Sequence, residues 1–190
     1  ALGYSFKFVW APLIDKLPVP LLTGLLGKRR AWLLVAQVFI LLAIVLMGSV
    51  DPALGESHLK WMAWAAVLLG FSAATQDIVI DAYRIELAET QMQTVLASTY
   101  NAGYRIGMIV AGAGALFLAA SLGTAKGNYI YSAWKITYLA MAAVMLIGII
   151  TTLVIREPQV NRVNKHYQRR DYFRLVAVFF VAVLSFVLCY

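Results

Sequence analysis

The sequence has few charged residues and almost no cysteine. Only 13% of its 190 residues are charged, 62% are hydrophobic, and its mean hydropathy is +0.78. Soluble domains carry about 25% charged residues, and disordered chains have few apolar ones, so this composition argues against both. The single cysteine, Cys189, excludes an internal disulfide framework and a cysteine-based metal site.

Sequence motifs for phosphate, dinucleotide or metal chemistry are also missing. No glycine-rich phosphate loop, dinucleotide fingerprint or paired-histidine zinc motif occurs. The two histidines, His58 and His166, stand far apart in predicted loops. We therefore expect no cofactor, no metal site and no catalytic residue. The net charge of +7 does not predict a nucleic-acid partner, because basic loops beside membrane spans give the same excess.

Long apolar stretches are the main feature of the sequence. A helix needs about 20 mostly apolar residues to cross the hydrocarbon core of a bilayer. The predicted spans are residues 1–17, 31–50, 61–84, 95–121, 133–155 and 173–190. The fold class expected is all-α: a polytopic transmembrane helical bundle in a lipid bilayer. The first residue lies inside an apolar stretch and the last span reaches the final residue, so we expect an incomplete piece of a longer chain, with the remainder of that chain as a partner.

Basic residues predict the orientation of these spans. Lysine and arginine gather in the loops after the first and fifth spans, Arg84 stands at the end of the third span, and the other two loops hold few basic residues. By the positive-inside rule, the basic loops are cytoplasmic. The last of them, within 156–172, is the most polar stretch of the chain and contains Pro158, so we predict a cytoplasmic linker there.

Two cations are predicted near the middle of the membrane. Lys7 and Arg105 each stand ten residues from the cytoplasmic end of a predicted span, which is about 15 Å along a helix. Charged groups at that depth usually face a bundle interior or a watery cavity. Two interpretations stay open. The cations pair with a buried carboxylate or reach toward the interface, or they line a cavity for an anionic solute.

The third span carries acidic residues on one helical face. Asp77, Asp81 and Arg84 follow at i, i+4 and i+7. Asp77 is a candidate for proton coupling, because a buried carboxylate can change protonation as a cavity opens to either side. A static salt bridge is the alternative for Asp77, and it is the favoured interpretation for Asp81 near the cytoplasmic rim.

A polar and aromatic stripe is predicted on the cytoplasmic half of the fourth span. Tyr100 and Tyr104 are spaced i, i+4, and Asn101 and Arg105 repeat that spacing one step on. Such a stripe can stack on sugar rings and bond their hydroxyls, and interhelical hydrogen bonds are the alternative. In the first basic loop, Asp15 precedes the Gly27-Lys28-Arg29-Arg30 cluster, a pattern that can form a charge clasp.

Four blocks of sequence, in order, resemble the AmpG-type muropeptide permeases of the major facilitator superfamily, to which acetyl-CoA transporters are related. The blocks are KFVWAPLID (7–15), GKRRAWLL (27–34), ATQDIVIDA (74–82) and GYRIGM (103–108). The resemblance implies that residues 1–155 hold family helices two to six of an N-terminal bundle. Residues 156–172 would then link it to a second bundle that begins with the helix at 173–190.

The resemblance also implies a function. The family imports anhydro-muropeptides from periplasm to cytoplasm for cell-wall recycling, driven by protons, in the bacterial inner membrane. The implied substrate is a small anionic glycopeptide, held by Lys7, Arg105 and the stripe of Tyr100, Asn101 and Tyr104. The implied cytoplasmic gate comprises Asp15, Arg29, Arg30, Asp81 and Arg84.

Other functions are left open by the sequence. An organic-anion or acyl-CoA carrier of the same fold also fits two intramembrane cations. A membrane enzyme acting on lipid-linked sugars is a different class, as is a non-transporting sensor. No nucleophile or metal set converges on Asp77 and Asp81, so we expect a transporter rather than an enzyme.

Overall fold

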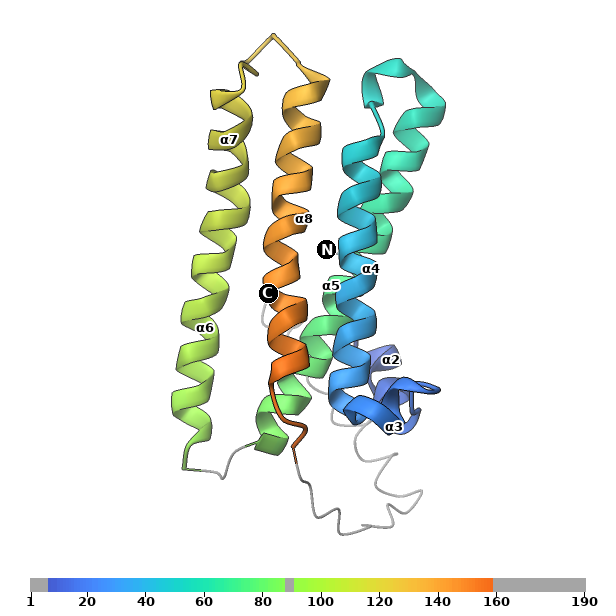
Figure 1. The fold of residues 1–190 in the computed structure, drawn as a ribbon, viewed down its shortest axis with the longest axis vertical. Coiled ribbons are helices and arrows are strands. Elements are labelled where there is room, and N and C mark those ends of the chain that lie inside the picture. Colours follow the sequence, from blue (N-terminus) through green and yellow to red (C-terminus); the bar gives the residue numbers. More distant parts are fainter. Residues whose placement is uncertain (1–6, 88–90, 159–190) are drawn as a thin grey trace, which may run out of the picture. The chain divides into compact units, whose positions relative to one another are not determined.

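The structure is a computed structural model that describes residues 7–87 and 91–158, all within one unit of the chain, residues 1–159. The described residues form helices and a single isolated β-bridge, Ala125 with Asn128 (Figure 1). The helical elements are α2 (Lys7–Lys16), α3 (Leu22–Leu26), α4 (Lys28–Ser49), the 3₁₀ turn η1 (Pro52–Leu54), α5 (Glu56–Leu87), α6 (Gln93–Ile109), the π-helical turn η2 (Val110–Gly114), α7 (Ala115–Ser121) and α8 (Tyr131–Val154).

Membrane-length helices confirm the predicted all-α, polytopic fold class. Four helical runs in the described residues are long and apolar enough to cross a bilayer: α4, α5, the α6–α7 run and α8. They correspond to the predicted spans at 31–50, 61–84, 95–121 and 133–155. The predicted span at 1–17 is described only as α2, from Lys7 onward. The span predicted at 173–190 and most of the linker lie outside the described residues.

The second loop is organised by Asp51, which follows α4. Its carboxylate accepts a hydrogen bond from the backbone N–H of Ala53 at 3.0 Å and so caps η1, where Pro52 prevents α4 from continuing. The same carboxylate accepts from the hydroxyl of Tyr129 at 3.2 Å, which joins this loop to the loop before α8. Burial and the negative charge of Asp51 raise the pKa of Tyr129.

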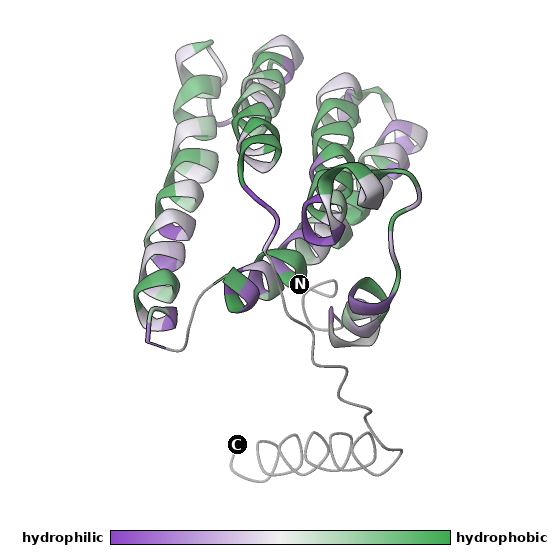
Figure 2. Cartoon of the chain, turned by 60° about the horizontal axis from the view of Figure 1, so that its bottom comes forward, coloured by the Kyte–Doolittle hydropathy of each residue, from purple (hydrophilic) through white to green (hydrophobic). Residues whose placement is uncertain are grey.

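Helix α4 is the centre of the packing. It lies against both α5, which crosses behind it, and α8, while α2 contacts α5 (Figure 1). Small residues fill these contacts, which lets the backbones approach closely without a hydrophobic driving force. Those almost fully buried are Ala31, Ala36, Ala43, Ala65, Ala74, Ala133 and Ala142. Many large apolar side chains are exposed instead, and Figure 2 colours much of the helical ribbon as hydrophobic.

Polar contacts also join α4 to α8. The hydroxyl of Thr152 donates to Gln37 Oε1 at 2.9 Å, and Gln37 Nε2 donates to the backbone oxygen of Gly148 at 3.3 Å. Gln37 and Thr152 are both buried. A buried amide needs such partners in an apolar medium, so these bonds fix the register of the two helices.

The α6–α7 run has far fewer contacts with the other described helices than α4 has. It packs on α8 mainly through α7, and its contact with α5 is small. Residues 101–113 are all exposed, and nothing within the described residues comes within 4 Å of a Cβ added at Gly103, Gly107, Gly112 or Gly114. These small residues therefore pack against no described helix.

We predict that Gly48 is required for the contact between α4 and α8. A Cβ at Gly48 would lie 2.8 Å from Tyr138 Cβ, an atom fixed to the backbone of α8, whereas Gly70 has open space around it. Overpacking of this kind costs about 1–3 kcal/mol. Gly48→Ala should lower the free energy of unfolding of the complete protein, measured by denaturant titration in mixed micelles. The matched Gly70→Ala change should not, and equal effects would contradict the packing.

Candidate functional site

An ion pair joins three helices near the middle of the unit. Lys7 Nζ of α2 donates to Asp77 Oδ2 of α5 at 2.7 Å, and the hydroxyl of Tyr100 of α6 donates to Asp77 Oδ1, also at 2.7 Å. The side chains of Lys7 and Asp77 are 38% and 20% exposed. Asp77 stands ten residues before the end of α5, which is about 15 Å along the helix. The two carboxylate oxygens therefore have separate donors on separate helices.

A pocket of about 360 Å³ opens beside this ion pair. Its lining comes from one face of α5 and one face of α6, as the three- and four-residue spacing of a helix requires. The lining residues are Ala73, Gln76, Asp77, Ile80, Tyr100, Gly103 and Tyr104. The rings of Tyr100 and Tyr104 stack with their centroids 6.5 Å apart, and Gly103 leaves open space between helix and pocket. The pocket thus offers aromatic faces, a carboxylate and an amide together.

Gln76 contributes an unsatisfied acceptor to this pocket. Its Oε1 atom is buried and has no hydrogen-bond donor among the residues that the structure describes. A buried amide oxygen without a donor is costly, so such atoms mark places where a ligand group or water donates.

Arg84 is a charged residue of α5 that lies closer to the end of the helix than Asp77 and Asp81. Its guanidinium lies 5.3 Å from the centroid of the Tyr100 ring, in cation–π geometry, and donates to Asp81 Oδ1 at 3.2 Å. Arg84 and Asp77 therefore both contact Tyr100, as the predicted common helical face requires. Asp81 therefore forms an ion pair with Arg84, a residue of its own helix.

The predicted binding residues are brought together only in part. Tyr100 and Tyr104 line the pocket and Lys7 borders it through Asp77. Asn101 and Arg105 are exposed and do not line it. The reason is helical geometry, because each lies about 100° around α6 from the tyrosine before it. Lys7 has Asp77 as its counter-ion, and within the described residues Arg105 has no ion-pair partner.

A second charged cluster lies at the basic end of the helices. Arg29, whose side chain is only 6% exposed, pairs with Asp15 of α2 and Glu86 of α5, each at 2.6 Å. The clasp between Asp15 and Arg29 is therefore present. The family resemblance implied Asp81 as its partner from the third span, but the partner on α5 is Glu86. The predicted third span ended at residue 84, which left Glu86 in a loop. Because α5 continues to Leu87, Glu86 is a helical residue facing Arg29.

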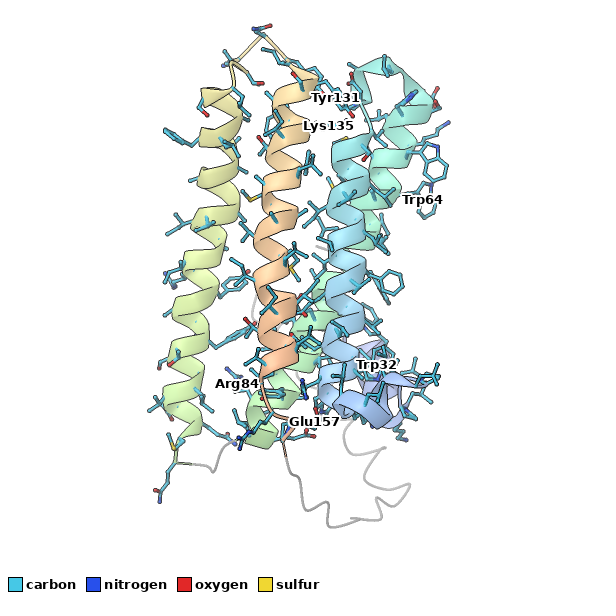
Figure 3. The ribbon with its side chains drawn as sticks, in the orientation of Figure 1. Trp32, Trp64, Arg84, Tyr131, Lys135 and Glu157 are labelled. Carbon is cyan, nitrogen blue, oxygen red and sulfur yellow. The ribbon has the colours of Figure 1, made fainter. Side chains whose placement is uncertain are left out.

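Arg30 and Glu157 form a reciprocal cap between α4 and α8. Glu157 accepts from the backbone N–H groups of Arg29 and Arg30 at 2.8 and 3.0 Å, which satisfies the start of α4. The Arg30 guanidinium donates to the backbone oxygens of Thr152 and Leu153 at the end of α8. Figure 3 shows Arg84 and Glu157 at this end of the helices, opposite Tyr131 and Lys135.

Gly27 makes room for that cap. Its φ is 89°, in the left-handed region, and a Cβ there would overlap the Glu157 side chain. Sequence reasoning missed Glu157, although the acid before Pro158, at the end of an apolar run, was a usable signal. No group of three or more metal-ligating side chains occurs within the described ranges.

The comparisons with known proteins agree with this architecture. The family model for the Major Facilitator Superfamily matches residues 2–190. The chain is 38% identical over 156 residues to the anhydromuropeptide permease of Escherichia coli K12, covering 82% of this chain and 28% of that protein. It is 32% identical to putative transporter AmpG 4 of Rickettsia felis, covering 85% and 36%, and 31% identical to putative transporter AmpG 3 of Rickettsia typhi, covering 93% and 40%. No solved structure matches.

These matches bear on the extent and location of the chain. It spans 28% to 40% of the length of these three relatives. Bacterial relatives named as permeases or transporters, together with the membrane-length helices, make this a multi-pass protein of the bacterial inner membrane. The recognised resemblance to the AmpG-type permeases is confirmed by the same matches.

We predict that Glu86 stabilises the complete protein and Asp81 does not. Removing one partner of a buried ion pair costs about 3 kcal/mol, so Glu86→Gln should lower the free energy of unfolding by about that amount. Asp81→Asn is the matched control, because its carboxylate is 38% exposed and such pairs contribute less than about 1 kcal/mol. Denaturant titration in mixed micelles measures both. A larger loss for Asp81→Asn would contradict the assignment of Arg29's partner.

Proposed function

Because the chain belongs to the Major Facilitator Superfamily, we propose that it is part of a proton-coupled transporter that imports anhydro-muropeptides from periplasm to cytoplasm. Transport would proceed by alternating access, in which two helical bundles rock about a site near the midplane. The observation that carries the proposal is the pocket beside the Lys7–Asp77 ion pair, which combines charge and aromatic faces about 15 Å from the end of α5. The name of the Escherichia coli relative supports the cargo.

The chemistry of the pocket suits an anionic glycopeptide. Tyr100 and Tyr104 offer ring faces for sugars, and Gln76 Oε1 offers an acceptor for a hydroxyl or amide N–H. Lys7 offers a cation for a carboxylate. Asn101 and Arg105, which are exposed on α6, would meet cargo from a different direction than the pocket residues.

Asp77 is the proposed proton-coupling residue and the cluster at the basic end is the proposed gate. Asp77 is the carboxylate that borders the pocket, so its protonation would be sensitive to what the pocket holds. The gate would comprise Asp15, Arg29, Arg30, Asp81 and Arg84, and the geometry adds Glu86 to that set. Ion pairs that close only one face of a transporter are suited to breaking when the bundles rock.

The domain plan follows from the same proposal. Residues 1–155 would be part of the N-terminal bundle, 156–172 a cytoplasmic linker, and 173–190 the first helix of the second bundle. The chain spans 28% of the Escherichia coli relative. It would supply one side of a central cavity, and the rest of the complete protein would supply the other.

We predict that Tyr104→Leu in the complete protein lowers uptake of labelled anhydro-disaccharide peptide about fivefold, because an aromatic contact contributes roughly 1 kcal/mol. Trp64→Leu is the matched control, since Trp64 is an exposed aromatic residue at the other end of α5, away from the pocket. Uptake is measured in cells with an intact proton gradient and again after its collapse. Collapse should abolish accumulation.

The same assay separates the alternatives. Competition by CoA esters or simple organic anions, with none by muropeptides, would identify a different carrier of this fold and overturn the cargo assignment. Undiminished accumulation without the gradient would overturn proton coupling. Binding of the glycopeptide without any flux would identify a sensor.

A further inference from the structure

The loop between α2 and α4 carries two leucines that lie almost entirely outside the packed helices. Leu21 is 90% exposed and Leu25 is 82% exposed, more than any other large hydrophobic side chain in the part of the chain that the structure describes. Helix α3, which contains Leu25, has only 5 residues and is far too short to cross a bilayer, so a membrane span does not account for this exposure. The two leucines need another apolar partner.

Leu21 also has a backbone conformation that leucine rarely adopts. Its φ is 66°, in the left-handed region, and among the described residues it is the one position other than glycine with a positive φ. The N–H of Leu22 donates to the backbone oxygen of Pro20 at 2.8 Å, which closes a tight turn around Leu21. Glycine or asparagine would fit this turn with less strain, so an exposed leucine here indicates that its side chain has a use.

Several backbone donors of this loop are paired within the loop or are absent. Pro18 and Pro20 have no N–H group. The N–H of Val19 donates to the hydroxyl oxygen of Thr23 at 2.8 Å, and the N–H of Thr23 donates to the backbone oxygen of Val19 at 3.1 Å. The N–H of Leu22 is paired in the turn described above. Because an unpaired backbone donor is costly away from water, these contacts suit a loop that enters an apolar layer.

The loop lies at the basic end of the membrane-length helices. Figure 1 shows α3 beside the start of α4, and the two helices are in contact. Leu25 precedes Lys28, the first residue of α4, by at most about 11 Å of chain. Lys16 ends α2 on the other side of the loop. The positive-inside rule assigns this end to the cytoplasmic face, where anionic headgroups attract basic side chains. The leucines are therefore flanked by charges complementary to that surface.

We propose that the loop between α2 and α4 is an interfacial anchor, which inserts Leu21 and Leu25 into the cytoplasmic leaflet and places the lysines at its two ends on anionic phospholipids. Buried apolar area and attraction to anionic lipids are the two sources of affinity for elements of this kind. Asp15 and Arg29 pair with each other across the ends of the loop, so the anchor holds their clasp at the membrane surface. The inference rests on the membrane location of the chain and not on its cargo.

The test measures the depth of both leucine positions in the complete protein, reconstituted in vesicles of phosphatidylcholine and phosphatidylglycerol. Leu21→Cys and Leu25→Cys each receive a nitroxide spin label, in a background where every other cysteine, Cys189 included, is serine. Collisions of the label with oxygen, which concentrates in hydrocarbon, are compared with collisions with a water-soluble nickel chelate. Both labels should favour oxygen, at a depth of about 5–10 Å into the boundary between headgroups and acyl chains.

Lys126→Cys is the matched control. Lys126 is exposed in the loop between α7 and α8, which also joins two membrane-length helical runs. The sequence from Gly123 to Asn128 has no large apolar side chain, so a label at this position should favour the nickel chelate. Labels at Leu21 and Leu25 that behave like this control would overturn the anchor.

Leu21→Asn, combined with the label at Leu25→Cys, excludes an effect of the label itself. Asparagine tolerates a positive φ, so the turn should persist without the apolar side chain. Loss of one of the two anchoring leucines should move the label toward water and lower its ratio of oxygen to nickel collisions. An unchanged ratio would show that the label, and not Leu21, seeks the membrane, and would overturn the inference.

The nature of the partner is tested by two further outcomes. In vesicles of phosphatidylcholine alone both labels should lie closer to water, because the lysines lose their anionic partners, and an unchanged depth would overturn the assignment of an anionic lipid. Low access to both oxygen and nickel would show that the rest of the complete protein covers the leucines, and would overturn a lipid partner. None of these measurements involves cargo, so the proposed transport function is tested separately.

Discussion

An ion inside an apolar slab must find an opposite charge or water, and that constraint explains where this chain places its charged side chains. Lys7 and Asp77 satisfy it together in the interior, 2.7 Å apart and beside a pocket. Arg29 satisfies it with Asp15 and Glu86 at the basic end. The interior pair differs from the end cluster in one respect that matters for function, because a pocket beside it offers room for a competing ion.

Among the described residues, α4, α5 and α8 form a closely packed group, and the α6–α7 run has fewer contacts with it. Small residues and the buried contact between Gln37 and Thr152 join α4 closely to its neighbours, and the caps of Arg30 and Glu157 fix one end. By contrast, the α6–α7 run has little contact with α5 within the described residues. The pocket lies between α5, which belongs to the closely packed group, and α6. Asp77 belongs to the closely packed group and Tyr100 to α6, so their hydrogen bond joins a closely packed helix to one that has few contacts with it among the described residues.

Much of the fold could be read from the sequence, because hydropathy and loop charge report directly on membrane spans. The four spans that the structure describes were predicted, with ends that differ by a few residues. The pairing of charges was harder. Lys7 stood out through its depth, but its partner depends on how α2 crosses α5, and only tertiary packing determines that. Glu86 was missed because a small error in the end of α5 moved it from a helix into a loop. Arg105 was a candidate to line a cavity with Lys7 because the two have a similar predicted depth, and depth does not say on which side of α6 a residue lies.

The central claim is that Asp77 couples the binding of a proton to the binding of cargo, and proton uptake on binding tests it most directly. The complete protein, in weakly buffered detergent solution at a pH above the Asp77 titration, is mixed with saturating anhydro-disaccharide peptide while a pH indicator is followed. The account predicts uptake of about one proton per cargo bound in the wild type and none in Asp77→Asn. Binding without proton uptake in the wild type would contradict it.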